Sequence, residues 1–352
     1  MSEISFFKRR WKLLLNIFTV LALIIFTYAI RHQLVYTLEN FHKVNLWALL
    51  LIIPIEIWNY DSQARVYKHL FGILGNRLSY KFWYELALEL NFINGVFPSG
   101  GVSGISYLGV RLRSNDIRAS RAAAVQIMKL MLTFFAFELL LLFGVLMLVV
   151  MGRVSNITVL IASSLTTLIL VGTLIFTYVI GSRERISISS TIITRGINRI
   201  IYIVRPRHPE TINITKVRYL FEELHENYIL FQSHYRDLKA PFIYAFIANL
   251  TEVLAVYTVY VAFDHWVNLG AIILAYAVAN FAGLISVLPG GIGVYEALMT
   301  GVLVASGIPA ALSIPVVIMY RVINTIIQFP PGYFFYHRTL NSDHNTGERL
   351  SS

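Results

Sequence analysis

Cysteine is absent from the 352 residues of this chain, and charged residues are scarce, at 14% of the total. Without cysteine the chain forms no disulfide and offers no thiolate to a metal ion or a redox reaction. A soluble globular protein is about 25% charged and about 45–50% apolar, whereas 57% of this chain is hydrophobic. Both departures indicate a protein whose main solvent is the lipid bilayer.

Motifs of the common hydrolases and nucleotide-binding proteins are also missing. The sequence contains no G-x-S-x-G, no P-loop and no H-E-x-x-H. The nine histidines lie mostly in loops or near the ends of apolar runs and show no metal-ligand spacing. The polar stretch 182–240 is too short and too poor in glycine motifs for a nucleotide-binding domain. We therefore expect no enzyme activity, no cofactor and no metal ion.

Long apolar runs are what the chain has instead. A helix needs about 20 apolar residues to cross a bilayer. The first run follows a basic N-terminus, but it is longer than a signal-peptide core and no cleavage site follows it. We expect it to stay attached as a transmembrane helix, and we expect a short polar loop at 61–81. The predicted spans are 13–30, 46–60, 122–151, 156–181, 241–263 and 310–336.

Two further apolar segments, 82–110 and 269–306, are each broken by proline and paired glycines, as Pro-Ser-Gly-Gly in the first and Pro-Gly-Gly in the second. Proline removes a backbone donor and glycine admits positive φ, so a helix ends at each break and a short helix begins near Ser103 and near Val294. The return arms of about a dozen residues are too short to cross, which predicts re-entrant hairpins. The residues of the breaks are Pro98, Gly100 and Gly101 in the first, and Pro289, Gly290, Gly291 and Gly293 in the second.

The basic residues are distributed unevenly along this pattern. If the N-terminus is inside and each hairpin returns to its own side, 24 of the 29 Lys and Arg fall inside and 3 outside, while Lys129 and Arg321 fall within spans. Positive charge accumulates in cytoplasmic loops. The excess predicts that both termini are cytoplasmic and that the protein lies in the cell membrane. It also explains the net charge of +10 without a nucleic-acid partner.

An internal repeat relates the two hairpins. A shift of 191 residues aligns Pro98 with Pro289 and Gly100 with Gly291, and gives nine identities over residues 91–130. Because the hairpins enter from opposite sides, the halves have opposite orientation, as in many secondary transporters. The predicted fold is an all-α polytopic membrane protein, with about six full transmembrane helices, two re-entrant hairpins and an inverted repeat of two halves. Its parts are a first half at 1–181, a cytoplasmic amphipathic helical linker at 182–240, a second half at 241–336 and a cytoplasmic tail at 337–352.

Charged side chains within the apolar segments are candidates for function, because each costs ~2.5–3.5 kcal/mol at mid-bilayer. Four of them have a polar neighbour at i,i+3 on the same helix face. The pairs are Glu56 with Asn59, Lys129 with Gln126, Glu252 with Asn249, and Arg321 with Asn324. Lys129 and Arg321 also occupy near-equivalent places in the repeat. The predicted substrate-binding residues are Lys129, Arg321, Glu296, Glu252, Glu56 and Asn324.

Two interpretations of these charges stay open. Either the two cations line a polar cavity for an anionic headgroup, or they form ion pairs with Glu56 or Glu252 that hold the bundle together. Glu296 either caps a short helix or contacts a proton or headgroup. For Glu85 and Glu138, placement near the ends of spans is the favoured explanation.

The sequence around the two breaks resembles a known family. Residues 91–113 and 288–296, followed by Gly307-Ile308-Pro309 and Arg321, resemble the lysylphosphatidylglycerol synthase transmembrane region. This flippase-like family includes the N-terminal part of the multiple peptide resistance factor. Tyr295 departs from the basic residue that members often have before the motif glutamate, which leaves the charge of the substrate open. The resemblance carries over Pro98, Gly100, Gly101, Pro289, Gly290, Gly291, Gly293, Glu296 and Arg321.

The resemblance implies a lipid flippase or transporter that moves an anionic phospholipid or another lipid-linked polar molecule. Because 16 residues follow the last predicted span, we expect no soluble aminoacyl-transfer domain. One alternative is an enzyme, or a membrane subunit of one, that acts on lipid-linked sugars or aminoacyl lipids. Another is a non-transporting scaffold whose amphipathic helix at 217–231 recruits a partner. The expected partners are a membrane lipid or lipid-linked substrate, with a second copy or a membrane enzyme as further candidates.

Overall fold

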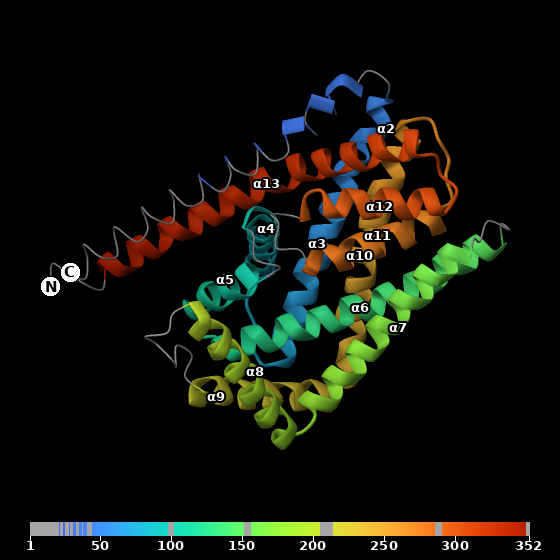
Figure 1. Ribbon diagram of the computed structural model, residues 1–352. Helices are drawn as coiled ribbons and strands as arrows, with labels where there is room; N and C mark the ends of the chain where they lie inside the picture. The colour runs from blue at the N-terminus through green and yellow to red at the C-terminus, as the bar shows by residue number, and fades with distance from the viewer. Residues whose placement is uncertain are drawn as a thin grey trace.

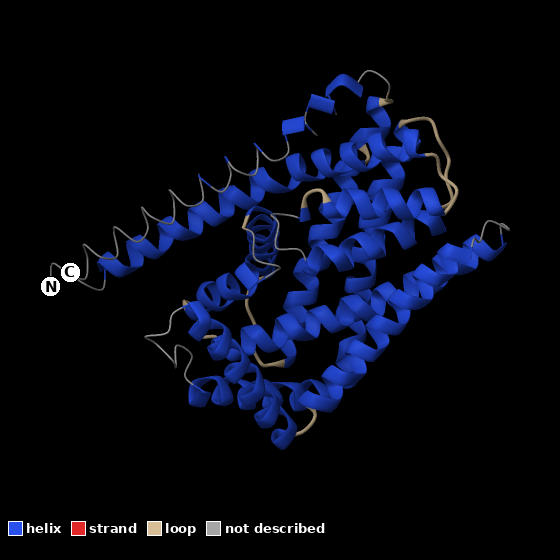
Figure 2. Ribbon diagram, in the orientation of Figure 1, coloured by secondary structure: helices blue, strands red, loops and turns tan. Residues whose placement is uncertain are grey.

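The computed structural model describes residues 44–349 except 98–101, 151–155, 205–213 and 286–290, together with scattered positions between 21 and 40. Within this part of the chain every regular element is a helix (Figure 2). The all-α class predicted from the sequence is therefore confirmed.

Four helical stretches of the described chain are long and apolar enough to cross a membrane. They correspond to the predicted spans 122–151, 156–181, 241–263 and 310–336, which confirms a membrane protein with several apolar helices. The third joins a short 3-10 helix, η2, to α10, and the fourth is the part of α13 from Ala310 to Leu340. Their elements are α6 (Ala119–Val150), α7 (Asn156–Ile180), η2 (Tyr235–Leu238), α10 (Lys239–Ala262) and α13 (Ala310–Arg349).

The predicted span 46–60 is instead two helices, α2 (Leu46–Leu50) and α3 (Ile52–Ile73). Helix α3 continues through residues 61–73 of the stretch that was predicted to be a polar loop, and only residues 74–79 form a loop before α4 begins at Tyr80. It does so because Tyr67, Leu70 and Phe71 recur at helical spacing and are buried, while Asp61 and Arg65 pair at i,i+4 with 2.7 Å between carboxylate and guanidinium. Most of the predicted span 13–30 lies outside the described residues.

Each predicted hairpin contains two helices, α4 (Tyr80–Val96) with α5 (Val102–Arg113), and α11 (Leu269–Ile285) with α12 (Val294–Ala305). The short helices begin where the sequence predicted. Each has 12 residues, about 18 Å at 1.5 Å per residue, against about 30 Å of hydrocarbon. The break residues Pro98, Gly100, Gly101, Pro289 and Gly290 lie outside the described residues.

The order of helices α3 to α6 recurs in α10 to α13. Helices α4 and α11 both have 17 residues, and α6 and α13 begin at Ala119 and Ala310, which the 191-residue shift aligns. The packing is exchanged between the two sets: α4 packs against α13, and α11 packs against α6 (Figure 1). Helices α3 and α10 pack along each other between them.

The polar region contains α8 (Arg183–Val204) and α9 (Ile214–Ser233), which pack together at one end of the molecule (Figure 1). Helix α9 covers the predicted amphipathic stretch 217–231. Leu224 and Phe231 are buried on its apolar face and belong to an apolar cluster with residues of α3, α4, α5 and α6. The cluster attaches this polar region to the membrane helices.

Candidate functional site

A polar cluster lies where α10, α12 and α13 meet beside α3. The Tyr320 hydroxyl of α13 donates to Glu252 Oε2 of α10 at 2.6 Å. One turn further along α13, Asn324 Nδ2 donates to the Tyr320 hydroxyl at 3.3 Å, and Gln328 Nε2 donates to Asn324 Oδ1 at 2.5 Å. The i,i+4 spacing places these three side chains in one row, so α13 presents a hydrogen-bonded polar stripe within an otherwise apolar span.

Arg321 extends this cluster to the start of the short helix α12. Its Nε donates to Glu296 Oε1 at 3.2 Å, and its guanidinium carbon lies 4.5 Å from the centre of the Tyr295 ring. Glu296 Oε2 accepts the backbone N–H of Gly293 at 2.6 Å. Glu296 therefore caps α12 and pairs with Arg321 at the same time. The pair is largely shielded, with side-chain exposures of 22% for Arg321 and 12% for Glu296.

The backbone before α12 needs glycine. Gly291 and Gly293 have φ values of 66° and 84°, in the left-handed region that other residues enter at a cost of roughly 1–2 kcal/mol. This turn directs the backbone N–H of Gly293 and the N-terminus of α12 toward Glu296. A helix N-terminus carries partial positive charge, so Glu296 and the helix end form one electrostatic unit.

Glu56 is the least satisfied member of the cluster. Its side chain is fully buried, and neither carboxylate oxygen has a hydrogen-bond partner in the described part of the chain, although Gln328 and Tyr60 lie beside it. Glu252 is its acidic neighbour across the α3–α10 contact. A buried polar group without a partner is unusual and costly, so Glu56 offers acceptor capacity that a ligand or a proton can use.

Lys129 belongs to a neighbouring network rather than to the same cluster. Its Nζ donates to the Tyr67 hydroxyl at 3.0 Å and lies 3.4 Å from Gln63 Oε1. Gln63 Nε2 donates to Asn59 Oδ1 at 2.7 Å, and Asn59 Nδ2 donates to Thr251 Oγ1 at 2.9 Å. Among the described residues Lys129 forms no ion pair.

The structure thus brings five of the six predicted site residues together and sets one apart. Lys129 contacts α3 at Gln63, seven residues beyond Glu56, which is about 10 Å along the helix. The predicted pairing of two equivalent cations is therefore not a side-by-side arrangement. The ion pairs foreseen with Glu56 or Glu252 are absent among the described residues, where Arg321 pairs with Glu296. The five residues of the cluster are Arg321, Glu296, Glu252, Glu56 and Asn324.

A second polar cluster was not predicted from the sequence. Glu89 on α4 is fully buried and accepts from the Tyr107 hydroxyl at 2.8 Å, from Arg111 Nε at 3.1 Å and from the Thr339 hydroxyl at 2.8 Å. One turn earlier, Glu85 lies 3.6 Å from Arg338 of α13. The positive-inside assignment placed Arg111 in a cytoplasmic loop after the first hairpin, whereas it lies in the last turn of α5. The i,i+4 spacing of Glu85 and Glu89 in an apolar segment is the sequence feature from which this cluster could have been predicted.

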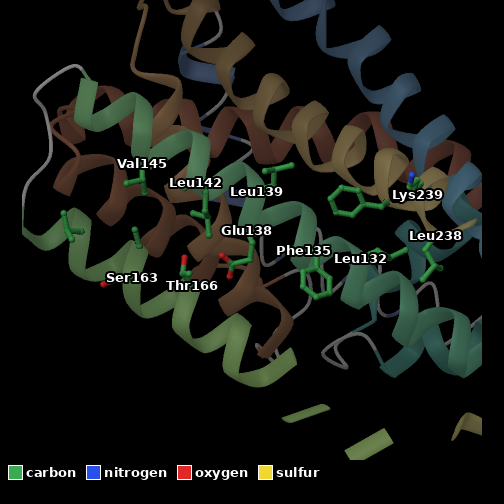
Figure 3. Close-up of a pocket in the computed structure, with 14 residues that line it drawn as sticks. Leu132, Phe135, Glu138, Leu139, Leu142, Val145, Ser163, Thr166, Leu238 and Lys239 are labelled. Carbon is green, nitrogen blue, oxygen red and sulfur yellow. The ribbon is translucent and has the colours of Figure 1, made fainter. Parts of the chain in front are cut away.

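An apolar groove of about 860 Å³ runs between α6 and α7 and reaches the start of α10. Its walls are leucine, valine and phenylalanine side chains, and Lys239 and Leu238 lie at one end (Figure 3). Glu138 points from α6 toward Thr166 of α7 (Figure 3). Helix α6 continues for 12 residues beyond Glu138, about 18 Å, so this carboxyl is not close to a span end as expected.

Comparison with known proteins agrees with this architecture. The sequence profile described as the lysylphosphatidylglycerol synthase TM region matches residues 13–332. A UPF0104 membrane protein of Methanothermobacter thermautotrophicus is 34% identical over 92 residues, which are 26% of this chain and 28% of that protein. A UPF0104 membrane protein of Pyrococcus horikoshii is 25% identical over 165 residues, 47% of this chain and 49% of that protein.

The matched stretches therefore span about half or less of these two relatives. The profile, by contrast, extends over nearly the whole chain, from the start of the first predicted span to the middle of α13, and includes both broken segments and Arg321. The chain belongs to the family of the lysylphosphatidylglycerol synthase TM region.

Proposed function

We propose that this protein is a lipid flippase or transporter, which moves an anionic phospholipid or another lipid-linked polar molecule across the cell membrane without chemical change. The observation that carries the proposal is the Arg321–Glu296 pair at the start of α12, beside the fully buried Glu56, which has only the side chains of Gln328 and Tyr60 as nearby donors among the described residues. Charge buried within apolar helices is costly. A site that offers both a guanidinium and an acceptor matches a headgroup that carries a phosphate and a donor.

The arrangement of the helices supports a transport role. Short helices α5 and α12 follow breaks in apolar segments, and non-helical backbone at membrane depth is tolerated where protein buries it or where it lines a wet cavity. We infer that both segments are re-entrant and that α3–α6 and α10–α13 form an inverted repeat. The exchanged packing of α4 on α13 and of α11 on α6 is what two related halves around a shared site would give.

The groove between α6 and α7 suits the apolar part of such a substrate. Ten of the fourteen residues that line it are apolar, Glu138, Ser163 and Thr166 are polar, and Lys239 lies at one end. We infer that acyl chains lie along this groove or the bilayer beside it, while the headgroup enters the polar cluster. The family description names a phosphatidylglycerol derivative, so phosphatidylglycerol and its aminoacyl esters are the first substrates to test.

The charge distribution supports an orientation with both termini and helices α8 and α9 in the cytoplasm. Ten of the basic residues lie between positions 183 and 239, and cytoplasmic segments carry such an excess. We propose that this region is a cytoplasmic linker between the two membrane halves.

Reconstitution tests this function directly. The purified chain is placed in liposomes that contain a trace of one lipid with a fluorescent label on its acyl chain, and the headgroup of this lipid is varied between experiments. Dithionite is then added outside the liposomes to destroy the exposed label. We expect the protein to make the inner-leaflet label of at least one anionic lipid accessible, while protein-free liposomes keep it protected. Protection of every lipid in a panel of phosphatidylglycerol, its lysyl ester, phosphatidylethanolamine and a lipid-linked sugar would contradict transport and favour the enzyme or scaffold alternatives.

A further inference from the structure

A second pocket, of about 750 Å³, lies at the polar end of α3, away from the cluster at Glu56. It is bounded by the end of α3, the α3–α4 loop, Trp83 of α4, and the segment from His234 to the start of α10. Lys68 is 12 residues beyond Glu56 on the same helix, about 18 Å along its axis. The pocket is therefore separate from the polar cluster proposed for the headgroup, although Lys239 lies both at the end of the apolar groove and in this pocket.

The pocket is strongly basic. Four cationic side chains line it: Lys68, Arg77, Arg236 and Lys239. Within the described part of the chain none of the four forms an ion pair, and Arg236 Nε bonds only to the neutral Tyr235 hydroxyl, at 3.2 Å. One acidic residue, Asp237, lines the same pocket. Four cations against one carboxylate produce a positive potential that attracts an anion.

An unsatisfied donor provides an independent indication of a ligand. Trp83 lines the pocket, its side chain is fully buried, and its Nε1–H has no acceptor in the described structure. The ring is fixed by stacking on Phe71, with 4.7 Å between ring centres. Buried indole N–H groups usually find an acceptor. An acceptor-rich ligand in this pocket would lie beside the residue that carries this unpaired donor.

We propose that this pocket binds a phosphate group. A phosphate has several acceptor oxygens, so it can receive the Trp83 N–H while arginine and lysine neutralise its charge, and the arginine fork fits two of its oxygens at once. The phosphate belongs either to a lipid headgroup at the membrane surface or to a free anion in solution. The proposal goes beyond transport, because it concerns a site distant from Arg321 and Glu296.

Tryptophan fluorescence of the full-length chain in neutral detergent tests the proposal. Replacement of Trp11, Trp47, Trp58 and Trp266 by phenylalanine leaves Trp83 as the reporter. Inorganic phosphate and dihexanoyl phosphatidic acid are titrated separately, with sodium chloride at matched ionic strength as the blank. We expect a saturable change with at least one phosphate source and none with chloride. A response to the lipid alone identifies a headgroup site, and equal responses identify a site for the free anion.

Charge variants make the result specific. Arg77→Gln and Lys68→Gln are expected to weaken phosphate binding about tenfold each. Arg113→Gln is the matched control, because Arg113 is exposed at the end of α5 and does not line the pocket. Thermal unfolding of the wild-type chain gives a second readout, with a midpoint that rises with phosphate and not with chloride. The inference is wrong if neither source gives a saturable response, or if Arg113→Gln weakens binding as much as Arg77→Gln. If the chain binds phosphate in this pocket but moves no lipid, the phosphate site stands and the proposed transport function is wrong.

Discussion

Arg321 in α13 and Glu296 in the first turn of α12 form an ion pair with 3.2 Å between Nε and Oε1. The other oxygen of Glu296 accepts the backbone N–H of Gly293 at 2.6 Å. A single carboxylate thus connects a long span to the start of a short helix that follows a break in the chain. This relationship means that a change at Arg321 acts on the headgroup site and on the position of α12 together.

We expect substitutions of Arg321 to lower the transport rate more as the side chain loses more of its hydrogen bonds to the headgroup. Arg321→Lys keeps the charge but loses the planar fork, so we expect about a tenfold lower flipping rate. Arg321→Gln also loses the charge, so we expect nearly complete loss. Flipping rates in liposomes, at matched amounts of folded protein, check this prediction. Equal activity of the lysine variant and the wild type would show that the fork is not used.

The positive φ of Gly293 makes the turn before α12 sensitive to a single methyl group. Gly293→Ala is expected to cost roughly 1–2 kcal/mol of stability and to lower transport, because the N-terminus of α12 shifts. Gly301→Ala, inside the same helix and facing open space, is the control and should be neutral or stabilising. Thermal unfolding and flipping rates of the two variants decide the point, and equal effects would contradict a special role for the turn.

The bulky variants Gly291→Leu and Gly100→Leu extend this test to both breaks. We expect each to abolish transport while the protein stays in the membrane, because a large side chain at either turn blocks a close approach of the backbone. Flipping assays and membrane fractionation check both points. If the two variants keep wild-type activity, the breaks are ordinary loops.

Much of this architecture could be predicted from the sequence, because apolar length and Pro-Gly-Gly breaks are local signals. Runs such as 122–151 and 310–336 identify spans, and the helix starts at Val102 and Val294 follow from the glycines before them. The loop predicted at 61–81 is helical as far as Ile73, because α3 combines buried aromatic residues with surface charge, and only residues 74–79 form a loop. A hydropathy pattern alone assigns such a helix to a loop.

The partners of buried charges were less predictable, because they depend on which helices meet. Sequence spacing placed Arg321 and Asn324 on one face, and both join the cluster. It gave no reason to expect that α4 packs on α13, so the contact of Glu89 with Thr339 was missed. The sequence repeat also suggested Lys129 as the near-equivalent counterpart of Arg321. In the structure Lys129 contacts the neutral side chains of Gln63 and Tyr67, whereas Arg321 pairs with a carboxylate.

The Glu89 cluster is expected to be structural. Glu89→Gln leaves Arg111 partly buried without its carboxylate, so we expect a loss of about 3–5 kcal/mol of stability, and the double variant with Arg111→Gln should recover part of it. Glu226→Gln removes an exposed pair with Arg183, whose side-chain exposures are 61% and 70%, and should cost less than about 1 kcal/mol. Unfolding midpoints in detergent measure these differences. Similar losses in Glu89→Gln and Glu226→Gln would contradict the assignment.

The absence of native cysteine allows a clean test of orientation. Tyr219 on α9 is 61% exposed and Trp266 in the α10–α11 loop is 75% exposed. We expect an impermeant maleimide to label Trp266→Cys in intact cells, and to label Tyr219→Cys only after the cells are opened. Labelling of Tyr219→Cys from outside would reverse the proposed topology.

The central claim is that Arg321 contacts the transported headgroup rather than only balancing Glu296. The most direct measurement is the flipping rate of the double variant Arg321→Gln and Glu296→Gln in liposomes, beside the two single variants. Removal of both charges relieves any uncompensated charge, so its unfolding midpoint should return toward that of the wild type. If Arg321 binds the headgroup, the double variant is stably folded, but liposomes that contain it flip lipid no faster than protein-free liposomes do. Full flipping activity in the double variant would contradict the claim and leave a structural ion pair in its place.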